Sequence, residues 1–302
     1  MPHREPATLR PATLPVILAT TLLVTVNAAI VNVALTSIRH DLGFTANTIS
    51  WVINAYLLAY GGLLIVGGRL GDVIGRRRAM LIGLALFTAA ALVGGFAGSP
   101  AVLVAARGVQ GVGGALAAPA VLAMITDLYQ DSARAKALSW FSVVLGVGLS
   151  FGFIAGGVIL QWLDWRWVFW INVPVGIALF PLTLLFVPAL RASQKHRLDV
   201  AGAVLATLTA VGVVLAVVQL ANLHRPDAVF ALSVAVAAVA LIGLVLRLRT
   251  ASEPLIPLGM FLRRSTVGAL VAMTLQSGAA TALLFFLSQL FAGGLGLVPI
   301  GV

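Results

Sequence analysis

Long charge-free stretches dominate this chain. No Asp, Glu, Lys or Arg occurs within residues 11–38, 42–68, 79–106, 137–163, 167–190, 200–224, 228–246 and 265–302, and another apolar run separates Arg107 from Asp127. A helix needs about 20 apolar residues to cross a bilayer, and each of these stretches supplies roughly that many. Lipid offers no partner to the backbone of an open strand, and the runs lack the alternation of a barrel. The sequence therefore predicts an all-α, polytopic membrane protein.

The basic side chains indicate its orientation. Nine spans are expected, at 13–38, 47–67, 79–98, 101–126, 137–162, 167–188, 200–222, 228–247 and 266–291. With the amino terminus inside, fifteen of the nineteen Lys and Arg residues lie on the inner side, three on the outer side and one, Arg107, in the membrane. Cytoplasmic loops carry such an excess. We expect a multi-pass protein of the cell (inner) membrane with a cytoplasmic amino terminus, and we attribute the net charge of +10 to topology, not to nucleic-acid binding.

Connections between the spans suggest three parts. Six closely spaced helices form a first bundle over residues 1–190, and the polar stretch RASQKHRLD (191–199) precedes a two-helix insert over 191–250. Residues 251–302 are expected to hold a linker and the first helix of an incomplete carboxyl-terminal bundle. The fold expected is a six-helix bundle with about three further transmembrane helices.

No signature of an enzyme is present. The sequence has no GxxxxGK[ST], GxSxG or HExxH motif, no cysteine, and no pair of carboxylates within a span. Its four histidines lie at loops or tails, without metal-ligand spacing. We therefore expect no metal, no cofactor and no enzymatic activity.

Polar residues inside the spans are the candidates for function. Arg107 lies about six residues into the fourth expected helix, roughly 9 Å deep, and Gln110 lies close to the same face. A guanidinium at that depth is costly unless it faces a cavity or a partner, although it can also snorkel to the surface. Asn27, near the middle of the first helix, can bridge helices or contact a ligand, and Asn54 belongs to the start of the second. These four residues are the expected coupling or cavity group.

Glycines recur at helical spacing in two spans. In the fifth, Gly148, Gly152 and Gly156 repeat every four residues and Gly157 follows, and in the fourth Gly111 lies one turn after Arg107. Such stripes allow the backbones of two helices to approach closely. We expect these five glycines to form helix-packing seams.

A glycine-broken, charged segment joins the second and third spans. GGRLGDVIGRRRAM (67–80) contains Gly68, Asp72 and Gly75, followed by Arg76, Arg77 and Arg78. A purely topogenic loop explains the arginines but neither the aspartate nor the glycines.

Taken together, these segments resemble the major facilitator superfamily, specifically its fourteen-helix drug:proton antiporter branch. GRLGDVIGRRR (68–78) is similar to the motif between helices two and three, RGVQGVGGA (107–115) to the fourth-helix motif, and GVGLSFGFIAGG (146–157) to the fifth-helix antiporter motif. WRWVFWINVPVG (165–176) and EPLIPLGMF (253–261) fit the same branch.

The resemblance implies a secondary transporter that exports hydrophobic or cationic small molecules by proton antiport. It makes Gly68, Asp72, Gly75 and Arg76–Arg78 a cytoplasmic conformational latch, with the arginines meeting anionic lipid or helix ends. The partners implied are a small-molecule substrate, protons and the lipid bilayer. Asn27 stands where the family has an aspartate, so a uniporter without proton coupling is one alternative. The carboxyl-terminal half is expected to be missing, and the other alternative is a truncated, non-transporting membrane fragment.

Overall fold

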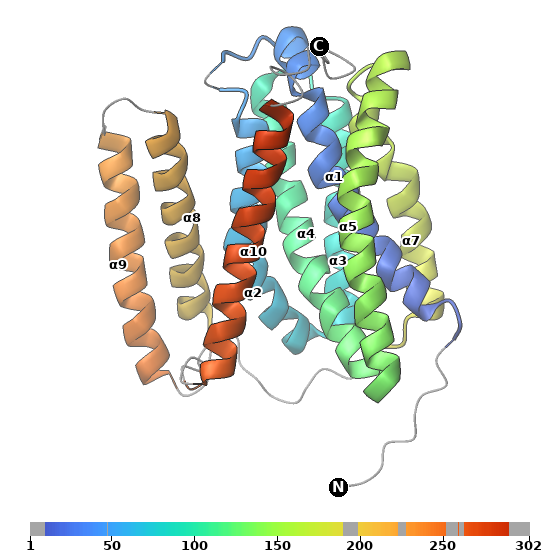
Figure 1. Ribbon diagram of the computed structural model, residues 1–302, viewed down its shortest axis with the longest axis vertical. Coiled ribbons are helices and arrows are strands. Elements are labelled where there is room, and N and C mark those ends of the chain that lie inside the picture. The colour runs from blue at the N-terminus through green and yellow to red at the C-terminus, as the bar shows by residue number, and fades with distance from the viewer. Residues whose placement is uncertain are drawn as a thin grey trace, which may run out of the picture.

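A computed structural model describes residues 10–46, 48–189, 199–222, 228–251, 259 and 263–289, and every regular element in these ranges is a helix. Figure 1 shows the long helices running side by side along one axis. The helices are α1 (Thr13–Leu42), α2 (Trp51–Ile74), α3 (Arg76–Gly95), α4 (Pro100–Leu128), α5 (Asp131–Trp162), α6 (Trp167–Trp170), α7 (Asn172–Phe186), α8 (Val200–Asn222), α9 (Ala228–Thr250) and α10 (Arg264–Gln289).

Eight segments of the described chain are long and apolar enough to cross a membrane. They are α1 to α5, the α6–α7 segment Trp167–Phe186, and the helices α8 and α9. Most of the ninth expected span, 266–291, lies in the continuous helix α10, and its last two residues lie outside the described residues. The prediction of an all-α polytopic membrane protein is confirmed.

The charged segment between the second and third helices differs from the expected loop. Helix α2 continues to Ile74 and α3 begins at Arg76, so Gly75 alone separates them. Gly75 has φ +96°, a left-handed conformation that costs glycine little and other residues much. A helix can continue past the bilayer surface, because the thickness of the bilayer sets only the minimum length of the apolar part. The spans estimated from hydropathy alone therefore ended the second helix too early, at residue 67, and began the third too late, at residue 79.

The sixth expected span is interrupted near its start. Helix α6 ends at Trp170 and α7 begins at Asn172. Pro174 has no backbone N–H to offer the carbonyl of Trp170. The side-chain amide nitrogen of Asn172 meanwhile donates to the carbonyls of Val168, at 2.9 Å, and Phe169, at 3.2 Å.

The first seven helices form one bundle. Helix α4 packs against α2 and α3, α1 packs against α5 and α7, and α7 also packs against α3. Helix α1 contacts α4 as well, so the two pairings are joined. Two clusters of buried apolar side chains fill the bundle, one around Met80, Phe87 and Met124 and one around Ile30, Val52 and Phe169.

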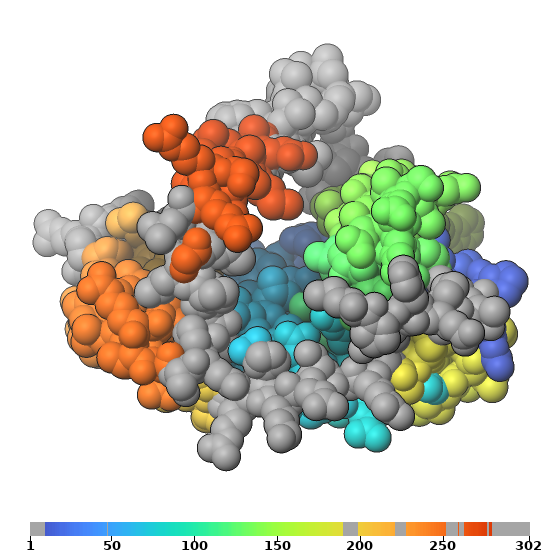
Figure 2. Space-filling view, turned by 90° about the horizontal axis from the view of Figure 1, so that it is seen from below, coloured from blue at the N-terminus to red at the C-terminus, as the bar shows by residue number. Residues whose placement is uncertain are grey.

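Helices α8 and α9 pack against each other, and α8 also packs against α2. The Thr207 hydroxyl donates to the carbonyl of Gly62 on α2 at 2.9 Å. Between α9 and α8, Arg247 Nε of α9 lies 3.0 Å from the buried carboxylate of Asp199, which directly precedes α8. Seen from the end where the chain begins, α9 and α7 lie on opposite sides of the molecule (Figure 2). Most of the polar stretch 191–199 lies outside the described residues.

Candidate functional site

Among the described residues, the largest fully buried side chain is that of Arg107, which is only 1% exposed. It lies about 10 Å inside the beginning of α4, counted at 1.5 Å per residue. Its Nε donates to the backbone carbonyl of Val52 on α2 at 2.9 Å. Its Nη1 donates to Asn27 Oδ1 at 2.8 Å and to Gln110 Oε1 at 2.7 Å. Arg107 therefore joins α4 to α1 and α2, and it does not snorkel to the surface.

Two tyrosines extend this site along α2. The guanidinium carbon of Arg107 lies 4.2 Å from the centre of the Tyr56 ring, a cation–π contact. Tyr56 stacks on Tyr60, with ring centroids 5.7 Å apart. Gly114 makes room for this pair, because a Cβ there would lie 3.0 Å from the Tyr60 ring and 3.4 Å from the Tyr56 hydroxyl. Helical spacing places Tyr56 one turn after Val52, but sequence reasoning gave it no role.

Of the four polar candidates, the structure brings three together. Asn27 and Gln110 are both completely buried and both accept from Arg107. Asn54 is half-buried, and its side chain makes no hydrogen bond to another described residue. We refer to Arg107, Asn27, Gln110 and Tyr56 as the Arg107 cluster.

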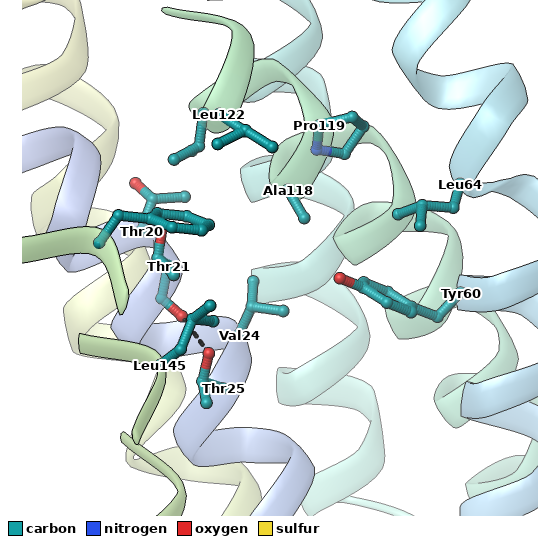
Figure 3. Close-up of a pocket in the computed structure, with 12 residues that line it drawn as sticks. Thr20, Thr21, Val24, Thr25, Tyr60, Leu64, Ala118, Pro119, Leu122 and Leu145 are labelled. Carbon is teal, nitrogen blue, oxygen red and sulfur yellow. Dashed lines mark hydrogen bonds between the residues drawn. The ribbon is translucent and has the colours of Figure 1, made fainter. Parts of the chain in front are cut away.

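A pocket of about 270 Å³ opens near this cluster, between α1, α2, α4 and α5. Figure 3 shows the threonines of α1 on one side and the Tyr60 ring on the other, with its hydroxyl turned toward the space between them. Its lining is mostly apolar: Thr20, Thr21, Val24, Thr25, Tyr60, Leu64, Ala118, Pro119, Val121, Leu122, Phe141 and Leu145. The hydroxyls of Thr20 and Thr25 donate to carbonyls of their own helix, whereas the buried Thr21 hydroxyl has no hydrogen-bond partner among the described residues. Such a wall suits a hydrophobic molecule with a few polar groups.

The glycine stripe of α5 faces α1. A Cβ on Gly152 would lie 2.7 Å from both Ala29 Cβ and the Val26 carbonyl oxygen, too close for any side chain there. A Cβ on Gly148 would lie 3.1 Å from the Cβ of Thr25, and a Cβ on Gly156 would lie 3.1 Å from the Cβ of Val33. Gly157 lies off this seam, because a Cβ there would meet no heavy atom within 4 Å.

The stripe of α4 faces α2. A Cβ on Gly111 would lie 2.8 Å from that of Ala59 and 2.5 Å from the carbonyl oxygen of Tyr56. The close approach brings the backbone of α2 to Arg107. The seam therefore positions the carbonyl of Val52 within reach of the guanidinium.

Near Gly75, Arg76 bridges three helices. It lies 3.4 Å from Asp72 of α2, forms an ion pair with Asp127 of α4, and donates to the carbonyl of Ala123 at 2.7 Å. Sequence reasoning missed Asp127. Its signal is a carboxylate that lies at the same end of the bundle as the arginines, in the last turn of a helix whose other charged residue is Arg107. Asp72, Arg76 and Asp127 are called the Arg76 bridge below.

The other residues of this segment have separate surroundings. Arg77 donates to the carbonyl of Leu184 near the end of α7, and Arg10 donates to that of Leu185 at 2.6 Å. Cations near a helix carboxyl terminus are favourable, because the last carbonyls have no partner within the helix. Arg78 is exposed, and Gly68 faces Pro119, with 3.5 Å between a Cβ there and the proline ring.

No group of three or more His, Cys, Asp or Glu side chains suited to a metal ion occurs in the part of the chain that the structure describes.

Comparisons with known proteins all point to one family. The sequence profile of the Major Facilitator Superfamily matches residues 17–301. The cephamycin export protein CmcT of Amycolatopsis lactamdurans is 39% identical over 95% of this chain and 62% of its own length. The puromycin resistance protein pur8 of Streptomyces alboniger is 36% identical over 95% of this chain and 57% of its own. The tetracenomycin C resistance and export protein of Streptomyces glaucescens is 32% identical over 99% and 56%. The chain thus spans about half the length of the curated relatives it matches.

Solved structures show the same fold. A mutant of the peptide transporter POT in complex with sulfate aligns with a TM-score of 0.61 at 18% identity, over 83% of this chain and 55% of its own. The proton:xylose symporter XylE bound to 6-bromo-6-deoxy-D-glucose aligns with a TM-score of 0.53 at 15% identity, over 80% and 54%. At these identities the likeness is one of fold alone.

Proposed function

We propose, on the premise that the chain belongs to the Major Facilitator Superfamily, that it forms the first bundle and the added helix pair of a transporter exporting hydrophobic small molecules. The family is one of transporters and not of enzymes, and the relatives include antibiotic export and resistance proteins. Export is proposed for a protein with two bundles, because rocking of one bundle against another around a shared site needs both. In this proposal residues 1–190 are one rocking unit, 191–250 its insert and 251–302 the beginning of the other.

The observation that carries this proposal is a buried cation next to an apolar pocket. Ionisable residues inside a membrane bundle are expensive and mark ligand or ion pathways. Arg107 is joined through Tyr56 to Tyr60, and Tyr60 lines the pocket. The pocket supplies apolar contact, and the Arg107 cluster supplies the polar end.

The lining of the pocket and the buried charge support a narrower substrate class than the one expected from the sequence. A hydrophobic molecule gains contact with the apolar wall, whereas a cationic one approaches a guanidinium whose hydrogen-bond acceptors are all uncharged. We therefore favour hydrophobic over cationic substrates.

The proposed orientation follows the charge asymmetry of the sequence. The ends of α2 and α4, which carry the Arg76 bridge, then face the cytoplasm, and Arg107 lies toward the outer side. The bridge ties α2, α3 and α4 into one unit, and this holds the segment of the proposed conformational latch in place. The arginines that reach the end of α7 serve the same cohesion, and the exposed Arg78 is free to meet anionic lipid.

Energy coupling is the second part of the proposal. We propose proton antiport in which the titrating carboxylate belongs to a residue other than Asn27, because the amide of an asparagine does not titrate. A uniporter remains the alternative, and it is favoured if export persists without a proton gradient.

Efflux measurements test both parts. Efflux-deficient bacteria producing the two-bundle transporter are loaded with a hydrophobic fluorescent dye, and dye loss is followed with and without a protonophore. We expect dye loss faster than in cells with the empty vector, and collapse of the difference when the protonophore is added. Dye loss at the rate of cells with the empty vector would contradict export. Dye loss that resists the protonophore would contradict proton antiport but not export.

A further inference from the structure

The positive charge of Arg107 has no negative partner on the helices that surround it. Its three hydrogen-bond acceptors are a backbone carbonyl and two side-chain amides, and its ring contact is a neutral phenol. The nearest carboxylates along these helices are Asp41 on α1, Asp72 on α2 and Asp127 on α4. At 1.5 Å per residue they lie about 20–30 Å from Asn27, Val52 and Arg107 respectively. The cluster therefore holds an uncompensated charge in the membrane.

Unused donors surround that charge. Asn27 Nδ2 and Gln110 Nε2 are buried and have no hydrogen-bond partner among the described residues. Each is bonded to the same carbon as the oxygen that accepts from Arg107, so neither nitrogen lies far from the guanidinium. The Nη2 group of Arg107 also makes no hydrogen bond to a described residue, since the Arg107 bonds involve only Nε and Nη1. Donors from α1 and α4 thus gather around one cation.

An anion satisfies both requirements at once. A water molecule can accept from the two amides, but it leaves the charge of Arg107 unbalanced. A carboxylate or a halide accepts from several N–H groups and supplies the missing negative charge, and charge-assisted hydrogen bonds are the stronger kind. The positive guanidinium repels any cation, and the N–H groups of the two amides offer a metal ion no ligand atom.

We infer that Arg107, Asn27 and Gln110 form a binding site for a monovalent anionic group. That group is a carboxylate carried by the exported molecule or a free chloride ion. The carboxylate source rests on the proposed export function, whereas the chloride source does not. The Tyr56–Tyr60 stack links the site to the pocket, since Tyr56 contacts Arg107 and Tyr60 lines the pocket. The inference assigns the apolar part of a hydrophobic acid to the α1 and α4 walls of that pocket.

Equilibrium binding by the purified full chain in detergent tests this inference. The midpoint of thermal unfolding is followed during titration with sodium benzoate, benzamide or sodium chloride, at an ionic strength held constant with sodium sulfate. Benzamide has nearly the shape of benzoate but no charge. We expect a saturable rise with benzoate, with chloride or with both, and no matching rise with benzamide. A response to benzoate alone assigns the substrate carboxylate, and a response to chloride assigns the free ion as well.

Two variants locate the site. Arg107→Gln keeps hydrogen-bonding groups but removes the charge, and we expect the anion affinity to fall about 10- to 100-fold. Asn27→Asp places a carboxylate 2.8 Å from Nη1, judged from the wild-type oxygen, and should abolish the anion response without lowering the midpoint measured in sulfate. Asn32→Asp is the matched control: it adds the same charge on α1, but the Asn32 amide bonds to the carbonyl of Ala28 and not to the cluster. It should keep the anion response.

Three results would overturn the inference. They are equal shifts with benzamide and benzoate, no shift with either anion, and an anion response that survives in Asn27→Asp. Because binding is measured without transport, these results leave the export proposal standing. Conversely, anion binding by a protein that exports no dye would support the site and contradict only the export.

Discussion

Arg107 Nη1 donates to Asn27 Oδ1 at 2.8 Å, which joins α4 to α1 across 80 residues of sequence. The acceptor is an amide at the position where the family resemblance places a carboxylate. Inside the bundle, α1 and α4 are therefore joined by a charge-to-neutral hydrogen bond. Such a bond keeps its strength at any pH at which the guanidinium is charged, because Asn27 has no proton to lose.

Replacing Asn27 by aspartate should change the coupling of transport. Asn27→Asp adds a titratable group in contact with Arg107, within a membrane segment that otherwise has none. We expect dye efflux by the variant to depend more steeply on the transmembrane pH gradient than efflux by the wild type. The measurement is the initial efflux rate at a series of imposed gradients in proteoliposomes. A variant with the wild-type gradient dependence would show that this position plays no part in coupling.

Glycine positions in α5 should differ sharply in their tolerance of side chains. Gly152→Val places methyl groups against Ala29 and Val26, where even a Cβ would lie at 2.7 Å. We expect a loss of about 1–3 kcal/mol, the usual cost of overpacking, and a lower midpoint of thermal unfolding.

Gly157→Val is the matched control for that substitution. It adds the same side chain five residues further along the same helix, where the Cβ meets no heavy atom within 4 Å. Its midpoint should stay at the wild-type value. Equal destabilisation by the two variants would refute the α1–α5 seam.

The Arg76 bridge should show coupling between α3 and α4. Arg76 and Asp127 are partly exposed, with side-chain exposures of 24% and 42%, so solvent screens the pair. A double-mutant cycle with Arg76→Gln and Asp127→Asn should give a coupling free energy of about 0.2–1 kcal/mol, weakened by salt. Thermal unfolding of the wild type, both single variants and the double variant supplies the four values. Additive effects of the two substitutions would mean that the ion pair contributes nothing to stability.

Much of the fold could be predicted because the bilayer imposes simple rules. A charge-free run of the right length predicts a helix, and α8 begins and ends at the expected residues. Helix ends at the membrane surface could not be placed, since nothing in hydropathy stops a helix there. Helix α1 therefore includes Arg39, His40 and Asp41, and only the backbone conformation of Gly75 separates α2 from α3.

The site was predictable where one residue breaks a physical rule on its own. A charge as deep as Arg107 and a mid-span amide such as Asn27 stand out in one dimension. Tyr56 and Asp127 did not, because an aromatic residue in a span and an acid at a helix end are both ordinary. Their roles come from what packs beside them. The distinction between Gly152 and Gly157 likewise depends on which face of α5 meets α1.

The proposed orientation predicts the accessibility of introduced cysteines. Gly98→Cys lies in the connection between α3 and α4, and Ser132→Cys lies in the exposed first turn of α5. Both positions can accept the change, since a Cβ at Gly98 meets no heavy atom within 4 Å and Ser132 is exposed. A membrane-impermeant maleimide added to intact cells should label Gly98→Cys, and Ser132→Cys only after permeabilisation. Labelling of both in intact cells would contradict the topology.

The Arg107 cluster is the centre of the functional account, so efflux by Arg107 variants tests it most directly. The rate of dye loss is measured for the two-bundle transporter carrying Arg107→Ala or Arg107→Lys, with membrane insertion checked by immunoblot of the membrane fraction. We predict that Arg107→Ala inserts normally but loses efflux. Arg107→Lys should recover only part of it, because lysine keeps the charge but lacks the planar fork that bonds Val52, Asn27 and Gln110 together. Efflux at the wild-type rate by inserted Arg107→Ala would contradict the account, since the buried charge would then serve only packing.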